Sequence, residues 1–245
     1  MRNIFLAFSI FLFACNSGKK DLQFEDSSNK FYVKMEESKK GVFVDTLYTF
    51  YDLNHTTTVK EIGFYKDGFR NDVWSYNLPT EVRTIKWGYY KDKYLNYETN
   101  LFEKADSVKH GDFFTNFLFT TSMGKVVLNI SVNGAFKDSL PEKNYERITK
   151  NEFSMMGAAL LMFDKKKLST NTHDIYINKI SVKTPANAIR YIKSCFSFID
   201  KNHFIEFSVS TSNKNDFYAN ALFDAVLTGF SIDGKRLYNP FKTIE

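Results

Sequence analysis

Glycine, proline and cysteine are scarce in this sequence: its 245 residues include 11 Gly, 4 Pro and 2 Cys. The low Gly and Pro content excludes the collagen-like and low-complexity classes. A dominant charge of one sign is lacking as well, because 33 basic and 28 acidic residues are intermixed and leave a net charge of +5. Nucleic-acid binding needs basic residues clustered on one face, so the composition predicts no nucleic-acid partner.

Apolar and aromatic residues, by contrast, are plentiful. Hydrophobic residues make up 43% of the chain and aromatic residues 17%, with 26 Phe, 14 Tyr and 2 Trp. This apolar fraction supports a sizeable core and excludes global disorder. Aromatic side chains suit pleated, half-buried surfaces, and the length favours one or two domains. The composition therefore predicts a strand-rich globular protein.

The N-terminal sequence, MRNIFLAFSIFLFAC, has the layout of an export signal. Arg2 gives it a positive start, and an apolar run follows from Ile4 to Phe13, broken only by Ser9. A run this short does not span a bilayer, which takes about 20 residues, but it fits the hydrophobic segment of a secretory signal. We expect residues 1–14 to be a signal peptide.

The segment Leu12–Cys15 resembles the lipobox of bacterial envelope lipoproteins, including those of Bacteroidota. The resemblance implies that Cys15 receives diacylglycerol, becomes the first residue after cleavage and is acylated again, typically with palmitate. Two or three acyl chains hold a protein on a membrane far better than one. Asn16 replaces the Asp that retains enteric lipoproteins in the inner membrane, which favours the outer membrane and leaves its side open. The alternatives are an ordinary signal peptide or a buried strand with an incidental Cys.

Residues 15–29 are polar, and we expect them to form a flexible tether between the anchor and the fold. Once Cys15 is lipidated, Cys195 is the only other thiol, so no disulfide forms within the chain. Cys195 lies in the strand-like segment 191–199. We expect it to be buried and inert.

Residues 30–103 alternate apolar and polar side chains, which predicts an antiparallel meander with short turns. The Asp-Gly pair that ends at Gly68 is the strongest hairpin signal in it. The stretch Tyr65–Tyr76 resembles the hairpin of MORN repeats, with matches at Tyr65, Gly68, Trp74 and Tyr76. That resemblance implies a scaffold for partner or lipid contact rather than a catalyst. An ordinary hairpin with core aromatics is the alternative.

A polar stretch over residues 104–112 separates the meander from residues 113–245. A second hairpin is predicted around Met123-Gly124, and a helix is predicted to start within Ser139–Glu142, which has the spacing of a capping box with Pro141 in the first turn. The C-terminal third predicts two strands and then a helix that ends at Thr228, with Gly229 in a left-handed conformation. The order of these elements resembles the PsbP/Mog1-type sandwich.

These patterns together predict the fold class α+β, strand-rich. An antiparallel β meander over residues 30–103 is followed, over residues 113–245, by an antiparallel sheet with one or two packed helices. The patterns leave open whether the two regions share one core.

Groups with recognisable chemistry are few. The four His residues have no metal-ligand spacing, and the sequence contains no nucleophile elbow, P-loop or dinucleotide-binding motif. We therefore assign no catalytic residue, no metal site and no cofactor. The run Lys165–Lys167 is expected to be a solvated loop, with contact to phosphate head groups as the alternative.

The leading hypothesis is a non-enzymatic, lipid-anchored envelope protein that binds a protein or glycan partner. An immunity-type lipoprotein that neutralises a toxin is a narrower form of it. Three aromatics of the meander, Trp74, Tyr76 and Trp87, are the candidate contact residues. The alternatives are an exported hydrolase, in which His110 or His173 meets carboxylates in a pocket, and a carrier of an apolar ligand.

Overall fold

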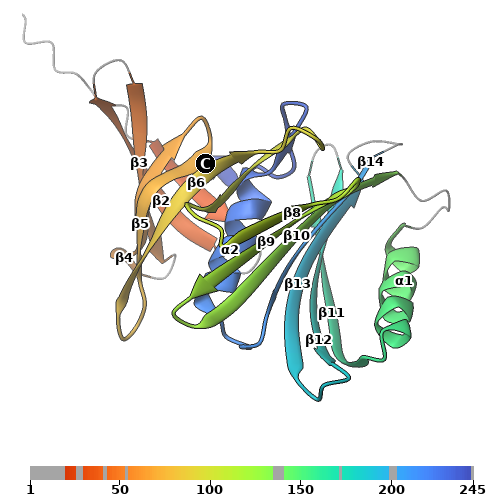
Figure 1. The fold of residues 1–245 in the computed structure, drawn as a ribbon. Coiled ribbons are helices and arrows are strands. Elements are labelled where there is room, and N and C mark those ends of the chain that lie inside the picture. Colours follow the sequence, from red (N-terminus) through yellow and green to blue (C-terminus); the bar gives the residue numbers. More distant parts are fainter. Residues whose placement is uncertain are drawn as a thin grey trace, which may run out of the picture.

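The computed structural model describes residues 20–25, 30–40, 43–52, 55–134, 141–170, 173–198 and 203–243. These residues form two antiparallel sheets and two helices (Figure 1). The prediction of a strand-rich fold with packed helices is therefore confirmed. The predicted signal peptide, residues 1–14, and the predicted lipidation site, Cys15, lie outside the described residues.

The larger sheet has ten strands in the order β16-β15-β7-β6-β5-β4-β3-β2-β1-β17. Strands β1 to β7 follow one another along the chain as an antiparallel meander, and the last strands of the chain extend both of its edges. The bounds are β1 (Lys20–Glu25), β2 (Lys30–Lys40), β3 (Phe43–Asp52), β4 (His55–Lys66), β5 (Phe69–Asn77), β6 (Val82–Lys91), β7 (Tyr97–Phe102), β15 (Ser231–Ile232), β16 (Lys235–Arg236) and β17 (Phe241–Thr243).

The second sheet has seven strands in the order β11-β12-β13-β14-β10-β9-β8. The predicted hairpin at Gly124 is confirmed as the β9–β10 turn, and β13 and β14 are the two predicted C-terminal strands. The bounds are β8 (Ser107–His110), β9 (Phe114–Thr121), β10 (Gly124–Gly134), β11 (Ala159–Ser169), β12 (Asp174–Lys183), β13 (Ile189–Phe198) and β14 (His203–Thr211).

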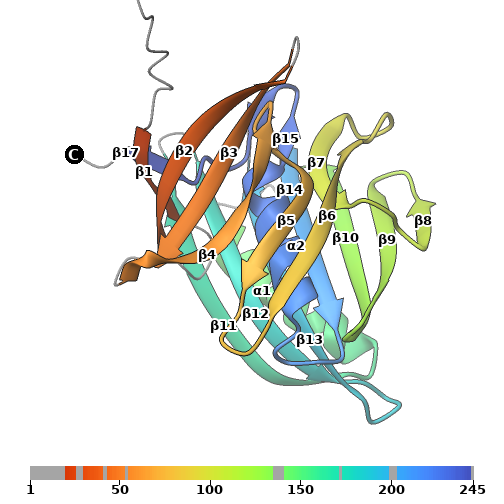
Figure 2. The same ribbon diagram turned by 90° about the vertical axis from the view of Figure 1, so that its left-hand side faces the viewer.

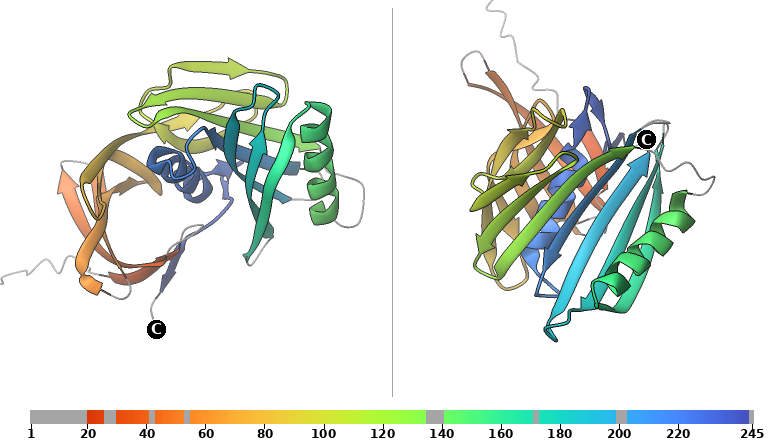
Figure 3. Two further views of the ribbon diagram at one scale, coloured as in Figure 1. Left: turned by 90° about the horizontal axis from the view of Figure 1, so that it is seen from below. Right: turned by 45° about the vertical axis from the view of Figure 1, so that its right-hand side comes forward.

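The two helices lie on opposite faces of the seven-stranded sheet. Helix α2 (Phe217–Gly229) lies between the two sheets, whereas α1 (Pro141–Met155) packs on the outer face beside β11 (Figures 2 and 3). Helix α1 begins at Pro141, as predicted, where the fixed φ of proline suits the first helical position. Among the described residues, neither helix is long and apolar enough to cross a membrane.

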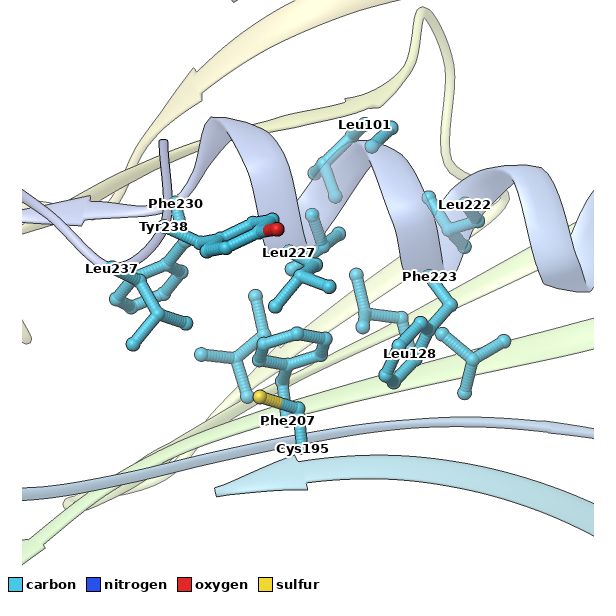
Figure 4. Packing of buried hydrophobic residues seen from close by; sticks show 14 of the residues in the cluster. Leu101, Leu128, Cys195, Phe207, Leu222, Phe223, Leu227, Phe230, Leu237 and Tyr238 are labelled. Carbon is cyan, nitrogen blue, oxygen red and sulfur yellow. The ribbon is translucent and has the colours of Figure 1, made fainter. Parts of the chain in front are cut away.

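A single main core joins both halves of the chain. It contains Trp74 and Tyr97 of the larger sheet, Phe207 of the other sheet and Leu222 of α2, all at most 1% exposed. Figure 4 shows the α2 side chains packed against Leu128, Cys195 and Phe207 of the seven-stranded sheet. Each fully buried side chain of this size stabilises the fold by about 1.5–3 kcal/mol. The sequence left open whether residues 30–103 and 113–245 share one core, and the structure shows that they do.

The predicted tether and the predicted lysine loop both contain strand in the structure. Residues Lys20–Glu25 form β1, which pairs with β2 and with β17. Lys165–Lys167 belong to the edge strand β11. Lysine side chains are common on edge strands, because they discourage pairing with other chains. A run of three lysines is therefore compatible with a strand at this position.

Gly229 does not have the predicted left-handed conformation. It is the last residue of α2, and Phe230 follows it as an extended C-cap residue with φ −70°. A Cβ at position 229 would lie 2.8 Å from Oδ1 of Asn100 in β7. Glycine is therefore needed here for the close approach of the helix to the larger sheet.

Candidate functional site

An open cleft of about 280 Å³ lies beside the first half of α2, on the face of the seven-stranded sheet that α2 covers. Strands β11 to β14, the loop after β14 and the start of α2 line it. We call it the lysine cleft. Its polar lining includes Lys179, Tyr191, Lys193, Thr211, Asn213, Lys214 and Asn220.

Strand pairing places two of these lysines side by side. Lys179 of β12 is directly opposite Lys193 of β13, and Tyr191 is directly opposite Thr211 of β14. Directly opposite residues share one face of the sheet, with Cβ atoms about 4.5–5.5 Å apart. Two lysine side chains therefore leave the sheet side by side and line the cleft.

Only one of the two opposed lysines has a carboxylate partner. The Lys193 ammonium lies 3.2 Å from Oδ1 of Asp224 on α2 and 4.4 Å from the centre of the Phe223 ring. Lys193 is 9% exposed and Asp224 8% exposed, so this ion pair is enclosed between helix and sheet. Among the described residues, no carboxylate forms an ion pair with Lys179 or with Lys214 at the rim.

The carboxylate of Asp216, which also lines the cleft, is committed to the helix. Its Oδ1 accepts a hydrogen bond from the Ala219 N–H at 3.1 Å, and its Oδ2 accepts one from the Thr211 hydroxyl at 2.8 Å. Asp216 is the N-cap of α2 and is 1% exposed. This cap satisfies one of the orphan N–H groups of the first turn. Asn220 Nδ2 donates to the Asp216 carbonyl oxygen at 2.9 Å, so, apart from the paired Lys193, the other ammonium and amide donors that line the cleft are those of Lys179, Asn213, Lys214 and Asn215.

The groups that line the cleft suit ligand binding more than acid–base chemistry. Lysine ammonium, Asn amide and Tyr phenol groups donate hydrogen bonds to ligand oxygens. None of the described residues that line the cleft is a His, Cys, Ser or Glu. The geometry thus offers a recess that combines lysines and amides with apolar side chains such as Met162 and Val209.

The three aromatics predicted to contact a partner lie in the interior instead. Trp74, Tyr76 and Trp87 are 0%, 4% and 3% exposed. They surround Arg70, whose guanidinium lies 4.3 Å from the Trp74 ring centre and donates to the Tyr76 hydroxyl at 2.7 Å. Trp87 Nε1 donates to the same hydroxyl at 3.0 Å. The prediction of exposed contact residues is corrected, because this face of the meander is covered by α2 and the second sheet.

The Arg70 cluster has a structural role. Arg70 is 4% exposed and pairs with Glu61 at 3.3 Å. Burial raises the pKa of the Glu61 carboxyl above its ordinary value, although Arg70 opposes the rise. The predicted MORN-like hairpin is a β4–β5 hairpin with positive φ at Asp67 (52°) and Gly68 (79°). Its aromatics belong to the core.

His110 makes the closest approach to a triad-like arrangement, but the geometry is unsuited to nucleophilic catalysis. Its Nδ1 lies 3.6 Å from Oδ2 of Asp92, and the Thr115 hydroxyl donates to that oxygen at 2.8 Å. Thr115 is 0% exposed, so its hydroxyl does not reach a substrate. Burial alone would raise the pKa of the Asp92 carboxyl, but hydrogen bonds from Leu95 N–H, Thr115 and Tyr94 N–H lower it. Asp92 therefore anchors a turn.

The other predicted residues are placed as follows. Cys195 is free and 0% exposed, and burial raises the pKa of its thiol well above the ordinary value, so the prediction of a buried thiol is confirmed. His173 Nε2 lies 2.8 Å from the carbonyl oxygen of Leu237. No group of three or more His, Cys, Asp or Glu residues in the described part of the chain is arranged to hold a metal ion.

Sequence reasoning missed the lysine cleft and the exposed aromatics. Lys179, Lys193 and Lys214 are far apart in the sequence, and they meet only because two hairpins and a loop bring them together. The two most exposed aromatics among the described residues are Tyr94 (81%) and Phe113 (63%). Each is in or beside a turn, which was a usable signal of exposure.

Comparisons with known proteins find solved structures that are only weakly similar to this chain. No family model matches the chain, and no curated protein matches it. The solution structure of cyanobacterial PsbP (CyanoP) from Synechocystis sp. PCC 6803 is 14% identical, with a TM-score of 0.40 over 60% of this chain and 92% of that one. A protein of unknown function from Pseudomonas aeruginosa is 11% identical, with a TM-score of 0.32 over 58% and 84%. The first loosely matches the predicted PsbP-like order of elements, and overlaps this weak identify no shared function.

Proposed function

We propose that this chain is a lipid-anchored protein of the bacterial cell envelope that acts as a non-enzymatic binding module, with the lysine cleft as its contact site for a protein or glycan partner. The lysine cleft carries the proposal. It is open to solvent and about 280 Å³ in volume, and its cations and amides come from two strands, a loop and a helix. Such recesses with a few convergent polar groups are where ligands bind.

The envelope location is supported by the sequence alone. Arg2, the apolar run and the lipobox ending at Cys15 occur in the order that lipoprotein signals require. Acylation of Cys15 would supply about 0.8 kcal/mol of membrane affinity for each buried CH₂ group. The membrane is then the first partner of the protein, and we place the anchor in the outer membrane.

The two alternatives have less support. A hydrolase needs an accessible nucleophile, whereas the hydroxyl beside His110 belongs to the fully buried Thr115. An apolar-ligand carrier needs a largely apolar cavity between the layers. Leu222, Phe223 and Leu227 of α2 are 0% exposed and fill most of the space between helix and sheet (Figure 4), and the cleft at the start of α2 contains three lysines.

The test compares two identical exchanges on helix surfaces. Asn220→Trp places a bulky ring at the cleft, and Asn151→Trp places one on the exposed side of α1. Crosslinking in intact native cells, followed by capture and mass spectrometry, should recover one reproducible partner with the wild-type chain and with Asn151→Trp. Asn220→Trp should lose most of it. Equal capture by both variants would show that the cleft is not the contact site.

A further inference from the structure

We infer that the lysine cleft is an anion site, which takes a ligand group of monosaccharide size that carries a carboxylate or a phosphate. The anionic oxygens would lie between the ammonium groups of Lys179 and Lys193. This inference rests on the proposed function, because it names the ligand chemistry of the same cleft.

The first step is the unfavourable pairing of like charges. Lys179 and Lys193 are directly opposite in neighbouring strands, and like charges in this arrangement destabilise a sheet. The strand register fixes the pairing over nine consecutive residue pairs, so the two lysine side chains leave the sheet from neighbouring positions on one face. An anion bound between them would turn this repulsion into attraction for both side chains.

The second step concerns the carboxylates nearby. Asp224 neutralises Lys193 from the helix side, and both oxygens of Asp216 are engaged in the helix cap. Asp164 of β11 is directly opposite Lys179 on its other side, yet no ion pair within 4.0 Å joins these two described residues. Lys179 and Lys214 therefore supply positive charge that the described carboxylates leave unpaired.

The third step concerns the size and polarity of the cleft. A volume of about 280 Å³ is at the lower end of small-molecule sites, so it holds one sugar-sized group. Tyr191, Asn213 and Asn220 surround the lysines with groups that hydrogen-bond hydroxyls. The lysines suit the charged group of a sugar acid or a sugar phosphate and the amides suit its hydroxyls, while apolar side chains such as Met162 and Val209 make up the rest of the lining.

The experiment measures binding of four probes to the mature chain by calorimetry. The probes are glucuronate, glucose 6-phosphate, inorganic phosphate and neutral glucose. We expect glucuronate, glucose 6-phosphate or both to bind, with glucose at least about tenfold weaker, since a hydrogen bond to a charged group is worth about a factor of ten or more. The stronger of the two anions distinguishes a carboxylate from a phosphate as the natural group.

Two Lys→Gln exchanges on one strand test the role of the charge. Lys179→Gln removes one of the opposed cations, and Lys183→Gln removes an exposed cation of β12 outside the cleft. We expect Lys179→Gln to raise the Kd at least about tenfold and Lys183→Gln to leave it within about twofold. Without ligand, Lys179→Gln should melt at the same temperature as the wild type or higher, because it removes a like-charge pair.

Three results would overturn the inference: glucose binds as tightly as the anions, anion binding is unchanged in Lys179→Gln, or neither glucuronate nor glucose 6-phosphate binds. If one of these results occurs while Asn220→Trp still loses partner capture, the anion site is refuted and the proposed binding module is not. Lys193 is left intact in every variant, because its removal would take away the cation with which the buried Asp224 carboxylate pairs.

Discussion

Charged side chains serve two different ends in this protein, and their surroundings distinguish the two. Arg70 is enclosed by Trp74, Trp87, Tyr76 and Glu61, where its bonds fix the packing of the larger sheet. Lys179 is exposed and lies opposite a like charge. The charge of Arg70 is balanced by Glu61 and by the aromatic rings around it. In our proposal, the charge of Lys179 is available to a ligand.

Glu206 gives a prediction about pH. Tyr145 of α1 donates a hydrogen bond to the Glu206 carboxylate and stacks on Phe196, with ring centres 3.8 Å apart. Burial raises the pKa of Glu206 above its ordinary value of 4.5, although the bond from Tyr145 opposes the rise. The native state therefore favours the protonated acid. Its contribution to stability is fully present below pH 4.5 and is lost as the pH rises through the raised native pKa.

Glu206→Gln keeps an acceptor for Tyr145 without burying a charge. We expect its melting temperature to exceed that of the wild type at pH 8, by about 2–4 °C for each kcal/mol gained, and to match it at pH 4. Calorimetry across this pH range is the measurement. Glu103→Gln, at an exposed ion pair with Lys86, is the control and should show no such trend. A Glu206→Gln variant less stable at pH 8 than at pH 4, relative to wild type, would refute the assignment.

Strands β4 and β5 are held together by the packing of the Trp74 ring on Gly63. Trp74 packs on Gly63, where a Cβ would lie 2.2 Å from the ring, and its Nε1 donates to the Phe64 carbonyl at 3.1 Å. At the turn of the same hairpin, Arg236 of β16 donates to the carbonyl oxygens of Asp67 and Gly68 at 2.8 Å each. The C-terminal strands thus stabilise a hairpin in the first half of the chain.

Gly63→Ala should destabilise the protein by about 1–3 kcal/mol, because the fully buried Trp74 ring has no room to move. Gly111→Ala is the matched control, since a Cβ there would lie 2.4 Å from the Phe114 ring. Phe114 is 39% exposed and can turn away. Urea unfolding measures both. Equal losses of unfolding free energy in the two variants would contradict this explanation.

Local patterns predicted most elements whose partners are close in sequence. The hairpin turn at Gly68, the start of α1 at Pro141 and the α2 helix before Phe230 follow from turn and capping chemistry. Strand β1 was missed although it pairs with β2, its neighbour in sequence, because its short sequence is mostly polar and resembles a linker. Its second partner, β17, comes from the far end of the chain.

The candidate site depended even more on long-range contacts. The aromatic residues Trp74 and Trp87 carry the clearest signal in the sequence, but alternation alone does not show which face of a meander the rest of the chain will cover. Lys179 and Lys193 carry no signal individually. Their chemistry arises from the β12–β13 register, which places them opposite each other.

At the scale of the whole molecule, the last strands of the chain extend both edges of the larger sheet. Strand β15 pairs with β7 and β17 pairs with β1, so the C-terminal residues extend both ends of the meander that the N-terminal half forms. Helix α2 and its core neighbours join the two sheets between them (Figure 3). One core therefore supports the lysine cleft.

Photo-crosslinking in intact native cells tests the binding role and the anchor together. A photoreactive residue replaces Lys214 at the rim of the cleft or, as the control, the exposed Lys235 on β16. We predict one dominant adduct from position 214, recovered with the membrane fraction, and we predict that position 235 does not give this adduct. Cys15→Ser should release the protein from the membrane fraction. The same adducts from both positions, no adduct from position 214, or membrane retention of Cys15→Ser would contradict a lipid-anchored module that binds through the lysine cleft.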